Sequence, residues 1–190
     1  DKAFIFVLYE SGCRIGEMIT IRMKDVEFDE HGAFLNVTGK TGPRRVRIIK
    51  SVPLLTIWLN CHKDSKNPES PLWVKLNNPK IEFLTIPTVR SFLKKIVRKA
   101  GIRKRVYLHL FRHSRATYLA SQISESLLKK HMGWVQNSDM PATYVHLSGQ
   151  ELDKALLKAS GIQISEKPKE EKLNIIQCPR CRNDNSAGSK

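Results

Sequence analysis

The chain has 190 residues, 41% of them hydrophobic and 27% charged, and is long enough to bury one hydrophobic core. No apolar run approaches the roughly 20 residues that a membrane-spanning helix needs, and residues 1–9 lack the basic flank of a signal peptide. Lysine and arginine number 33 against 18 acids, a net charge of +15 that favours nucleic acid as a partner over a membrane. We therefore expect a cytoplasmic, nucleoid-associated protein.

The spacing of apolar residues predicts a mainly helical chain. Helices are expected at residues 3–9, from about residue 14, and at residues 52–61, 88–101, 108–122, 125–132, 140–146 and 151–159. The segment from Thr88 to Gly101 is the most amphipathic of these, and Gly101 is expected to end it as a C-cap.

Three short strands interrupt the helices, at residues 26–29, 33–38 and 44–49. Two tight turns join them, which predicts a small antiparallel sheet and an α+β fold that is mainly α. In the third strand Val46 and Ile48 alternate with Arg45 and Arg47, so one face is expected to be buried and the other basic. We predict that Arg44, Arg45 and Arg47 contact DNA.

The composition changes after residue 162. Residues 1–162 are expected to form the folded domain, whereas residues 163–190 contain a charged linker and a tail expected to lack structure. Cys178 and Cys181 form a C-x-x-C motif that is typical of one half of a zinc ribbon, but neither Cys nor His follows it. No complete metal site is therefore expected in this chain, unless zinc is shared between chains.

Phosphodiester transfer without a metal needs a particular set of side chains. Guanidinium groups stabilise the charge that develops on the phosphate, and a nucleophile, a base and an acid complete the reaction. The sequence shows no obvious carboxylate cluster for Mg²⁺. Arg, Lys, His and Tyr would then have to carry this chemistry.

The first candidates lie in the N-terminal part of the chain. Arg14 and Glu17 are three residues apart and share a helical face, either as a surface ion pair or as part of a partly buried site with Glu17 as the brace. Lys40 lies in the turn Gly-Lys-Thr-Gly-Pro. It is either an ordinary exposed lysine or a proton donor to a departing 5′-oxygen.

The segment HLFRHSRATYLA has the densest group of candidates. His109 and Arg112 are three residues apart, so proton transfer and phosphate pairing can come from one helical face. His113 and Arg115 are expected to project elsewhere. His113 is equally well interpreted as structural or functional, and Arg115 as a contact to the DNA backbone.

Tyr144 is the candidate nucleophile, ten residues after Trp134. At pH 7 a free tyrosine lies about 3 units below its pKa, so forming the phenolate costs about 4 kcal/mol. A cage of positive groups would offset this cost, and the candidates for it are Arg14, Lys40, His109 and Arg112. Without such a cage, a half-buried tyrosine is usually structural.

These motifs together resemble the tyrosine recombinase family, which includes phage integrases and Xer-type proteins. The likeness spans residues 3–158, with six motif positions in family order. By this resemblance the catalytic residues are Arg14 in SGCRIGE, Lys40 in VTGKTGP, His109 and Arg112 in HLFRH, Trp134 in HMGW and Tyr144 in ATYVHLS, with Glu17 in support. Trp134 stands where most members have histidine, and His131 is not its replacement. The C-terminal part is most similar to archaeal plasmid or virus integrases.

The resemblance implies the fold of the DNA breaking-rejoining enzymes and a mechanism without cofactor, metal or ATP. Tyr144 would form a 3′-phosphotyrosyl intermediate, and strands would be exchanged through a Holliday junction. The implied partners are double-stranded DNA recombination sites and, on DNA, three further copies in a homo-tetramer. An N-terminal core-binding domain is expected to be absent, so the fragment alone should be a monomer or weak dimer. The helix at 151–159 would dock on a neighbour or pack on its own domain.

Two other functions use the same features. A type IB topoisomerase has similar Arg, Lys, His and Tyr chemistry but relaxes supercoils without exchanging partners. A catalytically idle DNA-binding module would need only the positive charge, although the presence of all six motif residues argues against it.

Overall fold

The computed structural model describes residues 1–145, 156–157, 160, 175–177 and 184–186. Its first compact unit is Asp1–Ser148. The helices of this unit are α1 (Lys2–Ser11), α2 (Ile15–Ile19), the short 3₁₀ helix η1 (Met23–Asp25), α3 (Val52–Cys61), α4 (Ile86–Lys99), α5 (Leu108–Ala120), α6 (Glu125–Met132) and α7 (Met140–Val145). Its strands are β1 (Val26–Asp29), β2 (Gly32–Gly39) and β3 (Gly42–Ile48). The expected class, mainly α with a three-stranded antiparallel sheet, is confirmed.

The sheet has the order β1-β2-β3 and two different faces. Its inner face is almost fully buried and consists of Ala33, Leu35, Val37, Val46 and Ile48. On the outer face the guanidinium carbons of Arg45 and Arg47 lie 3.4 and 3.8 Å from the centroid of the Phe34 ring. The same two arginines pair with Glu27 at 3.0 Å and Asp29 at 2.6 Å. The predicted alternation of a buried and a basic face is confirmed, and the basic face is largely charge-paired.

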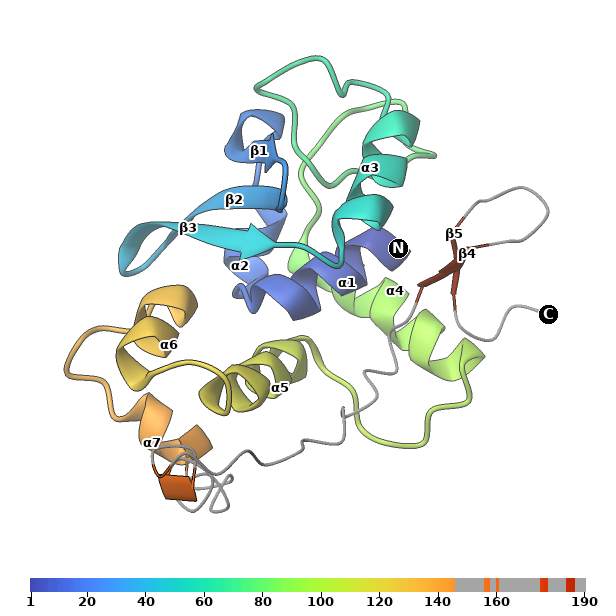
Figure 1. Cartoon of the computed structure of the whole chain (residues 1–190). Coiled ribbons are helices and arrows are strands. Elements are labelled where there is room, and N and C mark those ends of the chain that lie inside the picture. The colour runs from blue at the N-terminus through green and yellow to red at the C-terminus, as the bar shows by residue number, and fades with distance from the viewer. Residues whose placement is uncertain (146–155, 158–159, 161–174, 178–183, 187–190) are drawn as a thin grey trace. The chain divides into compact units, whose positions relative to one another are not determined.

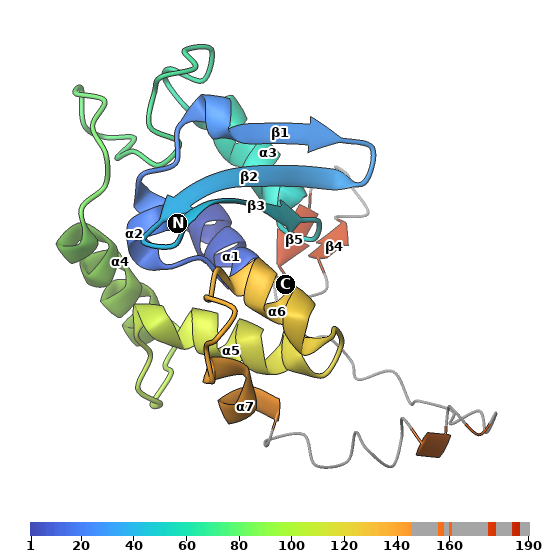
Figure 2. The same cartoon turned by 90° about the vertical axis from the view of Figure 1, so that its left-hand side faces the viewer.

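Helix α1 lies between the sheet with α3 on one side and α5 on the other (Figures 1 and 2). Its Phe4 ring meets the edges of Trp73 at 5.1 Å and Phe92 at 5.3 Å. Val7 and Leu8 of the same helix are buried against the inner face of the sheet and its neighbours. This main core is continuous from α1 to α4 and reaches the start of α5 at Leu108.

A second, smaller hydrophobic cluster joins α5, α6 and α7. Its buried members are Ala116, Leu119, Ala120, Leu128, Met132 and Tyr144, with Ile123 and Trp134 packed against them. The position of Tyr144, the predicted nucleophile, therefore depends on packing in this cluster and not on the main core.

Glycines end two of the helices that surround the site. Gly12 follows α1 with φ 61° and Gly133 follows α6 with φ 63°, both in the left-handed region that disfavours side chains with a Cβ. Gly101 also has a positive φ, but the C-cap of α4 is Ala100, one residue before the predicted Gly101. Helix α4 begins two residues earlier than expected because Thr85 caps it and Pro87 lies in its first turn.

The C-terminal unit, Gly149–Lys190, contains two short antiparallel strands, β4 (Ile175–Gln177) and β5 (Asp184–Ser186). The β-branched pair Ile175-Ile176 favours the first of these strands, and the proposed division between a folded domain and a tail stays a prediction. Cys178 and Cys181 lie outside the described residues, as does the predicted helix at 151–159 apart from helical residues 156 and 157. Within the described part of the chain, each helix is too short or too polar to cross a membrane.

Candidate active site

The first predicted arginine stands at the start of α2. Arg14 is the N-cap residue, and its main-chain N–H donates to Glu17 Oε2 at 2.8 Å. Arg14 Nη1 donates to Glu17 Oε1 at 3.0 Å. The carboxylate thereby satisfies one of the main-chain donors that the first turn of a helix leaves unpaired. The predicted contact is present and is partly buried, because Glu17 is only 4% exposed whereas the Arg14 side chain is 33% exposed.

Glu17 has a closer partner in Arg44 of β3. Nη1 and Nη2 of Arg44 donate to Oε1 and Oε2 of Glu17, each at 2.8 Å, which makes a bidentate pair. Burial by itself raises the pKa of Glu17, but the hydrogen bonds from Arg44 and from the main chain of Arg14 lower it to about 2. Glu17 is therefore ionised at neutral pH and compensates the charge of two arginines.

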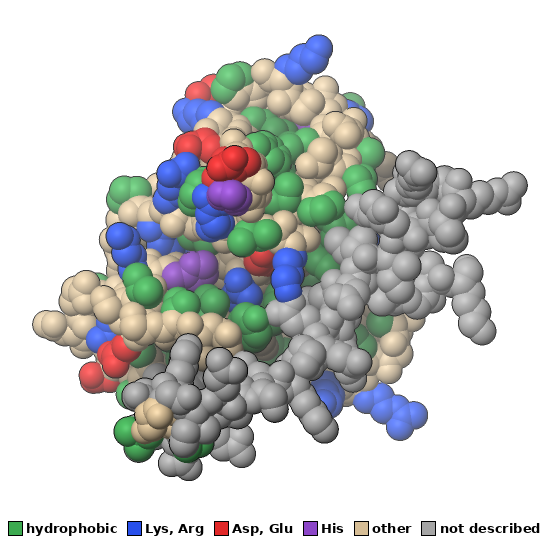
Figure 3. Space-filling model, in the orientation of Figure 1, with side chains coloured by type: hydrophobic (Ala, Val, Ile, Leu, Met, Phe, Trp, Pro, Cys, Tyr) green, Lys and Arg blue, Asp and Glu red, His purple; other side chains and the backbone are tan. Residues whose placement is uncertain are grey.

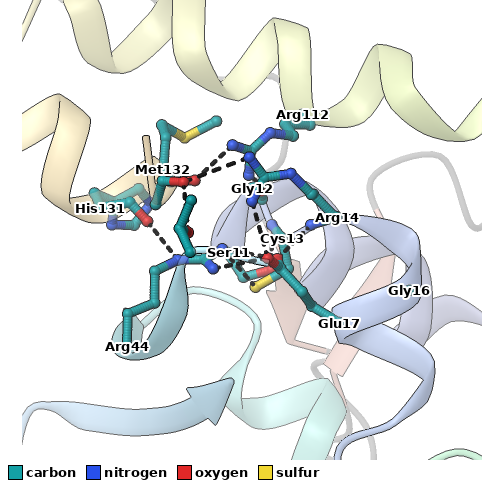
Figure 4. A network of polar contacts seen from close by, with 12 residues as sticks. Ser11, Gly12, Cys13, Arg14, Gly16, Glu17, Arg44, Arg112, His131 and Met132 are labelled. Atoms are coloured by element: carbon teal, nitrogen blue, oxygen red, sulfur yellow. Dashed lines mark hydrogen bonds and ion pairs between the residues drawn. The ribbon is translucent and has the colours of Figure 1, made fainter. Parts of the chain in front are cut away.

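Three successive carbonyl groups at the C-terminal end of α6 accept hydrogen bonds from arginines (Figure 4). The contacts are Arg44 Nε to the His131 oxygen at 3.0 Å, Arg112 Nη2 to the Met132 oxygen at 2.5 Å and Arg14 Nη2 to the Gly133 oxygen at 3.4 Å. A helix leaves its last carbonyl groups unpaired, and its dipole makes that end negative. The end of α6 is therefore a favourable place to gather guanidinium groups.

Arg112 of α5 connects this turn to the end of α1. Its Nη1 donates to the Gly12 carbonyl at 2.8 Å, and the residue is 4% exposed. Burial, followed by repulsion from Arg14 and Arg44, lowers the pKa of Arg112 to about 10, so the group remains charged at neutral pH. Arg14 and Arg112 thus come together, because both are held by the end of α6.

Lys40 lies in the turn between β2 and β3 with an exposed side chain. The residues on either side of it hold this turn against the site. Thr41 Oγ1 donates to the Gly133 carbonyl at 3.0 Å, and Gly39 lies so close to Glu17 that an added Cβ would overlap Oε1. These contacts place Lys40 at the edge of the arginine cluster.

His109 lies in the first turn of α5 and is also exposed. Partial burial lowers its pKa, and the positive charges of His113, Arg112 and Arg14 act in the same direction. The His109 ring meets the edge of the His113 ring at a centroid distance of 4.5 Å, and Arg112 follows three residues later on the same helix. A neutral imidazole in this position can donate or accept a proton at neutral pH.

Tyr144 of α7 is 5% exposed and packs between aromatic rings. Its ring stacks on Trp134, with centroids 5.6 Å apart and an interplanar angle of 12°. The Arg112 guanidinium carbon lies 5.7 Å from the centroid of the Trp134 ring. The Tyr144 hydroxyl forms a hydrogen bond with Nδ1 of His113.

The electrostatics of Tyr144 differ from the expected activating cage. Burial raises the pKa of the phenol, although Arg112 acts in the opposite direction. The reason is that Tyr144 is enclosed by the small α5–α7 cluster, and its hydroxyl contacts His113 instead of a guanidinium. Tyr144 lies next to Trp134, which Arg112 faces, but its phenol is protonated at neutral pH.

The structure brings five predicted residues together: Arg14, Glu17, Arg112, Trp134 and Tyr144. His109 meets this group through its ring contact with His113, and Lys40 precedes Thr41, whose side chain bonds to Gly133. Of the residues predicted to contact DNA, Arg44 is buried inside this group, where it pairs with Glu17. Arg45 and Arg47 lie on the outer face of the sheet. Arg115 packs near Tyr9 and Tyr118, with guanidinium-to-ring distances of 6.0 and 5.3 Å.

Two residues have roles that the sequence reasoning missed. Side chains alternate between the two faces of a strand, so Arg44 lies on the same inner face as Val46 and Ile48. This alternation is the signal that distinguishes Arg44 from Arg45. His113 lies four residues after His109, so the two share a helical face, and their rings meet edge to face at 4.5 Å. The expectation that His113 projects elsewhere was wrong.

Among the described residues, no group of three or more His, Cys, Asp and Glu side chains is arranged to hold a metal ion. The site described above is instead built of guanidinium, imidazole and aromatic groups around one carboxylate. A model of the phage integrase family matches residues 1–151. The chain belongs to the phage integrase family.

Relatives in this family carry names that agree with the sequence resemblance. Tyrosine recombinase XerA of Pyrococcus furiosus is 29% identical over 161 residues, which cover 84% of this chain and 54% of the relative. A tyrosine recombinase of Thermosipho africanus is 31% identical, covering 83% of this chain and 53% of its own length. The chain spans about half the length of these curated relatives.

Solved structures of recombinases share the fold. A crystal structure of XerA recombinase matches with a TM-score of 0.62 and 26% identity, covering 83% of this chain and 57% of that one. XerH bound to a palindromic difH substrate, in a post-cleavage complex, matches with a TM-score of 0.64 and 24% identity over 84% of this chain and 45% of that one. The sheet and helices described above are therefore those of a tyrosine recombinase catalytic domain.

Proposed function

We propose that this chain is the catalytic domain of a site-specific DNA recombinase that cleaves and rejoins DNA through a covalent bond to Tyr144. The observation that carries this proposal is the convergence of Arg14 and Arg112 on the end of α6, where the Trp134 ring lies between Arg112 and Tyr144 in the chain of contacts. Family membership and the names of the relatives support it. Cleavage would proceed without ATP, since the phosphotyrosyl bond retains the energy of the phosphodiester. The guanidinium groups would stabilise the charge on the phosphate in place of a metal ion.

The two arginines would hold the scissile phosphate. A guanidinium has five N–H donors, and within the described residues Arg112 uses two of them on the carbonyls of Gly12 and Met132. Up to three donors are therefore not used by these two carbonyls. Rigid, charged donors of this kind stabilise the negative charge that develops in the transition state.

The other residues would supply the proton transfers and the nucleophile. Lys40, exposed at the tip of the hairpin, would protonate the departing 5′-oxygen, and His109 would donate to or accept from the phosphate. Trp134 packs against Tyr144 and would keep its ring in place beside Arg112. Tyr144 would attack phosphorus and leave a 3′-phosphotyrosyl bond with a free 5′-hydroxyl.

Double-stranded recombination sites are the proposed partner, with four copies of the protein assembled on two sites. Net charge +15 supports DNA binding. Figure 3 shows lysine and arginine side chains over one face, several of them beside acidic groups. The contacts proposed for Arg45, Arg47 and Arg115 would add to phosphate binding. DNA affinity should fall steeply between about 50 and 300 mM salt, since each phosphate contact releases counterions.

The experiment that tests this function traps the covalent intermediate. The substrate is a pool of duplexes nicked beside the scissile phosphate, with randomised sequence on both sides, so that the short leaving strand diffuses away. We expect the wild type and the control Tyr118→Phe to form a protein–DNA adduct, and Tyr144→Phe to form none. Sequencing of the trapped DNA would then give the preferred site.

The outcomes also separate the alternatives. Absence of an adduct with the wild type would leave a DNA-binding module. Relaxation of a supercoiled plasmid lacking the selected site, together with no recombinants from paired sites, would indicate a topoisomerase.

A further inference from the structure

The nucleophile of the proposed reaction has a polar partner outside the predicted set. Nδ1 of His113 forms a hydrogen bond with the Tyr144 hydroxyl. His113 lies in the middle of α5, one turn after His109, whereas Tyr144 lies on α7. The contact therefore joins two elements that the hydrophobic packing of α5 and α7 already brings together.

The packing around Tyr144 fixes the orientation of its ring and therefore the position of its hydroxyl. Its ring is stacked on Trp134 and lies 5.9 Å from the His113 ring at an interplanar angle of 35°. With only 5% of the residue exposed, the hydroxyl has little access to water. When such a phenol attacks, its proton can pass to a protein group, and among the described residues the hydroxyl has His113 as its hydrogen-bond partner.

His109 is less well placed for this task. It lies at the exposed start of α5, where Arg112 and Arg14 influence its charge, and it touches His113 by an edge-to-face ring contact at 4.5 Å. This location suits a contact with the phosphate. His109 thus lies on the phosphate side of the site, and His113 lies on the tyrosine side.

We propose that His113 is a catalytic residue that positions the Tyr144 hydroxyl and accepts its proton during cleavage. The inference rests on the proposed function. The bond between Tyr144 Oη and phosphorus forms while the bond between phosphorus and the 5′-oxygen breaks. The phenol proton moves to Nδ1 of His113, and the 5′-oxygen receives a proton from Lys40. Religation reverses both transfers, so no oxidant, metal or nucleotide is consumed.

The hydrogen bond can be tested without DNA by ¹⁵N NMR of the histidine side chains. If the Tyr144 hydroxyl donates to His113, Nδ1 carries no hydrogen and Nε2 carries one. We expect this tautomer in the wild type and a clear shift of the Nδ1 signal in Tyr144→Phe, with exposed His31 unchanged in both. A hydrogen on Nδ1, or a His113 signal that ignores Tyr144→Phe, would overturn the proposal.

Its role in proton transfer can be tested with two nicked substrates, one normal and one with sulfur in place of the bridging 5′-oxygen. Sulfur leaves without being protonated, so the second substrate removes the need for Lys40 only. We expect Lys40→Ala to be slow on the normal substrate and restored by sulfur. His113→Ala should form adduct about 10²- to 10⁴-fold more slowly on both substrates.

A conservative variant separates positioning from proton acceptance. In His113→Asn the side-chain oxygen can accept the same hydrogen bond but cannot take up the proton. We expect wild-type thermal stability and slow cleavage, with His31→Ala as the unaffected control. Wild-type cleavage by His113→Asn, or rescue of His113→Ala by sulfur, would refute proton transfer to His113. Failure of the wild type itself would instead refute the proposed function.

Discussion

The two sides of the candidate site are held together by different forces. On the arginine side, Arg14, Arg44 and Arg112 are fixed by a buried carboxylate and by main-chain carbonyl groups from α1 and α6. On the tyrosine side, Tyr144 is fixed by ring packing on a small cluster and by one histidine. Ion pairs and hydrogen bonds thus hold the arginines that would bind phosphate in one arrangement. Aromatic packing holds Tyr144, the proposed nucleophile, on the separate α5–α7 cluster. The arginine side should therefore contribute more to stability than the tyrosine side.

The largest effect is expected from Glu17→Ala. This change leaves two guanidinium groups without the carboxylate that compensates them, and breaking a buried ion pair costs about 3–5 kcal/mol. Glu27→Ala, which removes the exposed partner of Arg45, should cost at most about 1 kcal/mol. Urea unfolding of both variants would measure the difference, and equal losses would contradict the distinction between the two ion pairs.

Acid should remove the stabilisation that ionised Glu17 gives to the wild-type protein. The pKa of Glu17 is about 2 in the folded protein and 4.5 when unperturbed, so the unfolded chain binds its proton first as the pH falls. The stabilisation is thus complete above pH 4.5 and is lost as the pH falls toward 2. We expect the stability difference between wild type and Glu17→Gln to narrow over this window in pH-dependent unfolding. A difference that stays constant would show that Glu17 is not the titrating group.

A smaller loss is expected from Gly39→Ala. The added methyl group would overlap the Glu17 carboxylate and displace either the carboxylate or the hairpin turn, a kind of overpacking that costs about 1–3 kcal/mol. Gly16→Ala is the matched control, since a Cβ at this position meets no other group within 4 Å. Thermal unfolding should separate the two variants. If both behaved alike, the close approach of the hairpin to Glu17 would not matter for stability.

The smallest effect is expected on the tyrosine side. Tyr144→Phe removes one hydrogen bond but keeps the ring on Trp134, so the loss of unfolding free energy should be about 0.5–1.5 kcal/mol. Chemical denaturation would measure it. A loss as large as that of Glu17→Ala would reverse the comparison between the two sides.

The sequence predicted more about the fold than about the details of the site. Helix 52–61 and strand 26–29 were predicted at their observed bounds because their apolar spacing is local information. The pairing of Arg44 with Glu17 depends on a register between a strand and a distant helix, and only the parity of Arg44 in β3 hinted at it. The contact of His113 with Tyr144 depends on where α7 packs, which periodicity does not specify. For the same reason the raised pKa of Tyr144 was not foreseen.

The contacts at the end of α6 have a consequence for sequence variation. The acceptors in these contacts are main-chain carbonyl oxygens of residues 131–133, which bond to Arg14, Arg44 and Arg112. A main-chain carbonyl is present whichever side chain the residue carries. At this turn a homologue can exchange His131 for another residue and keep every one of these bonds. Gly133 is different, because its left-handed conformation and its closeness to Arg44 leave little room for any larger residue.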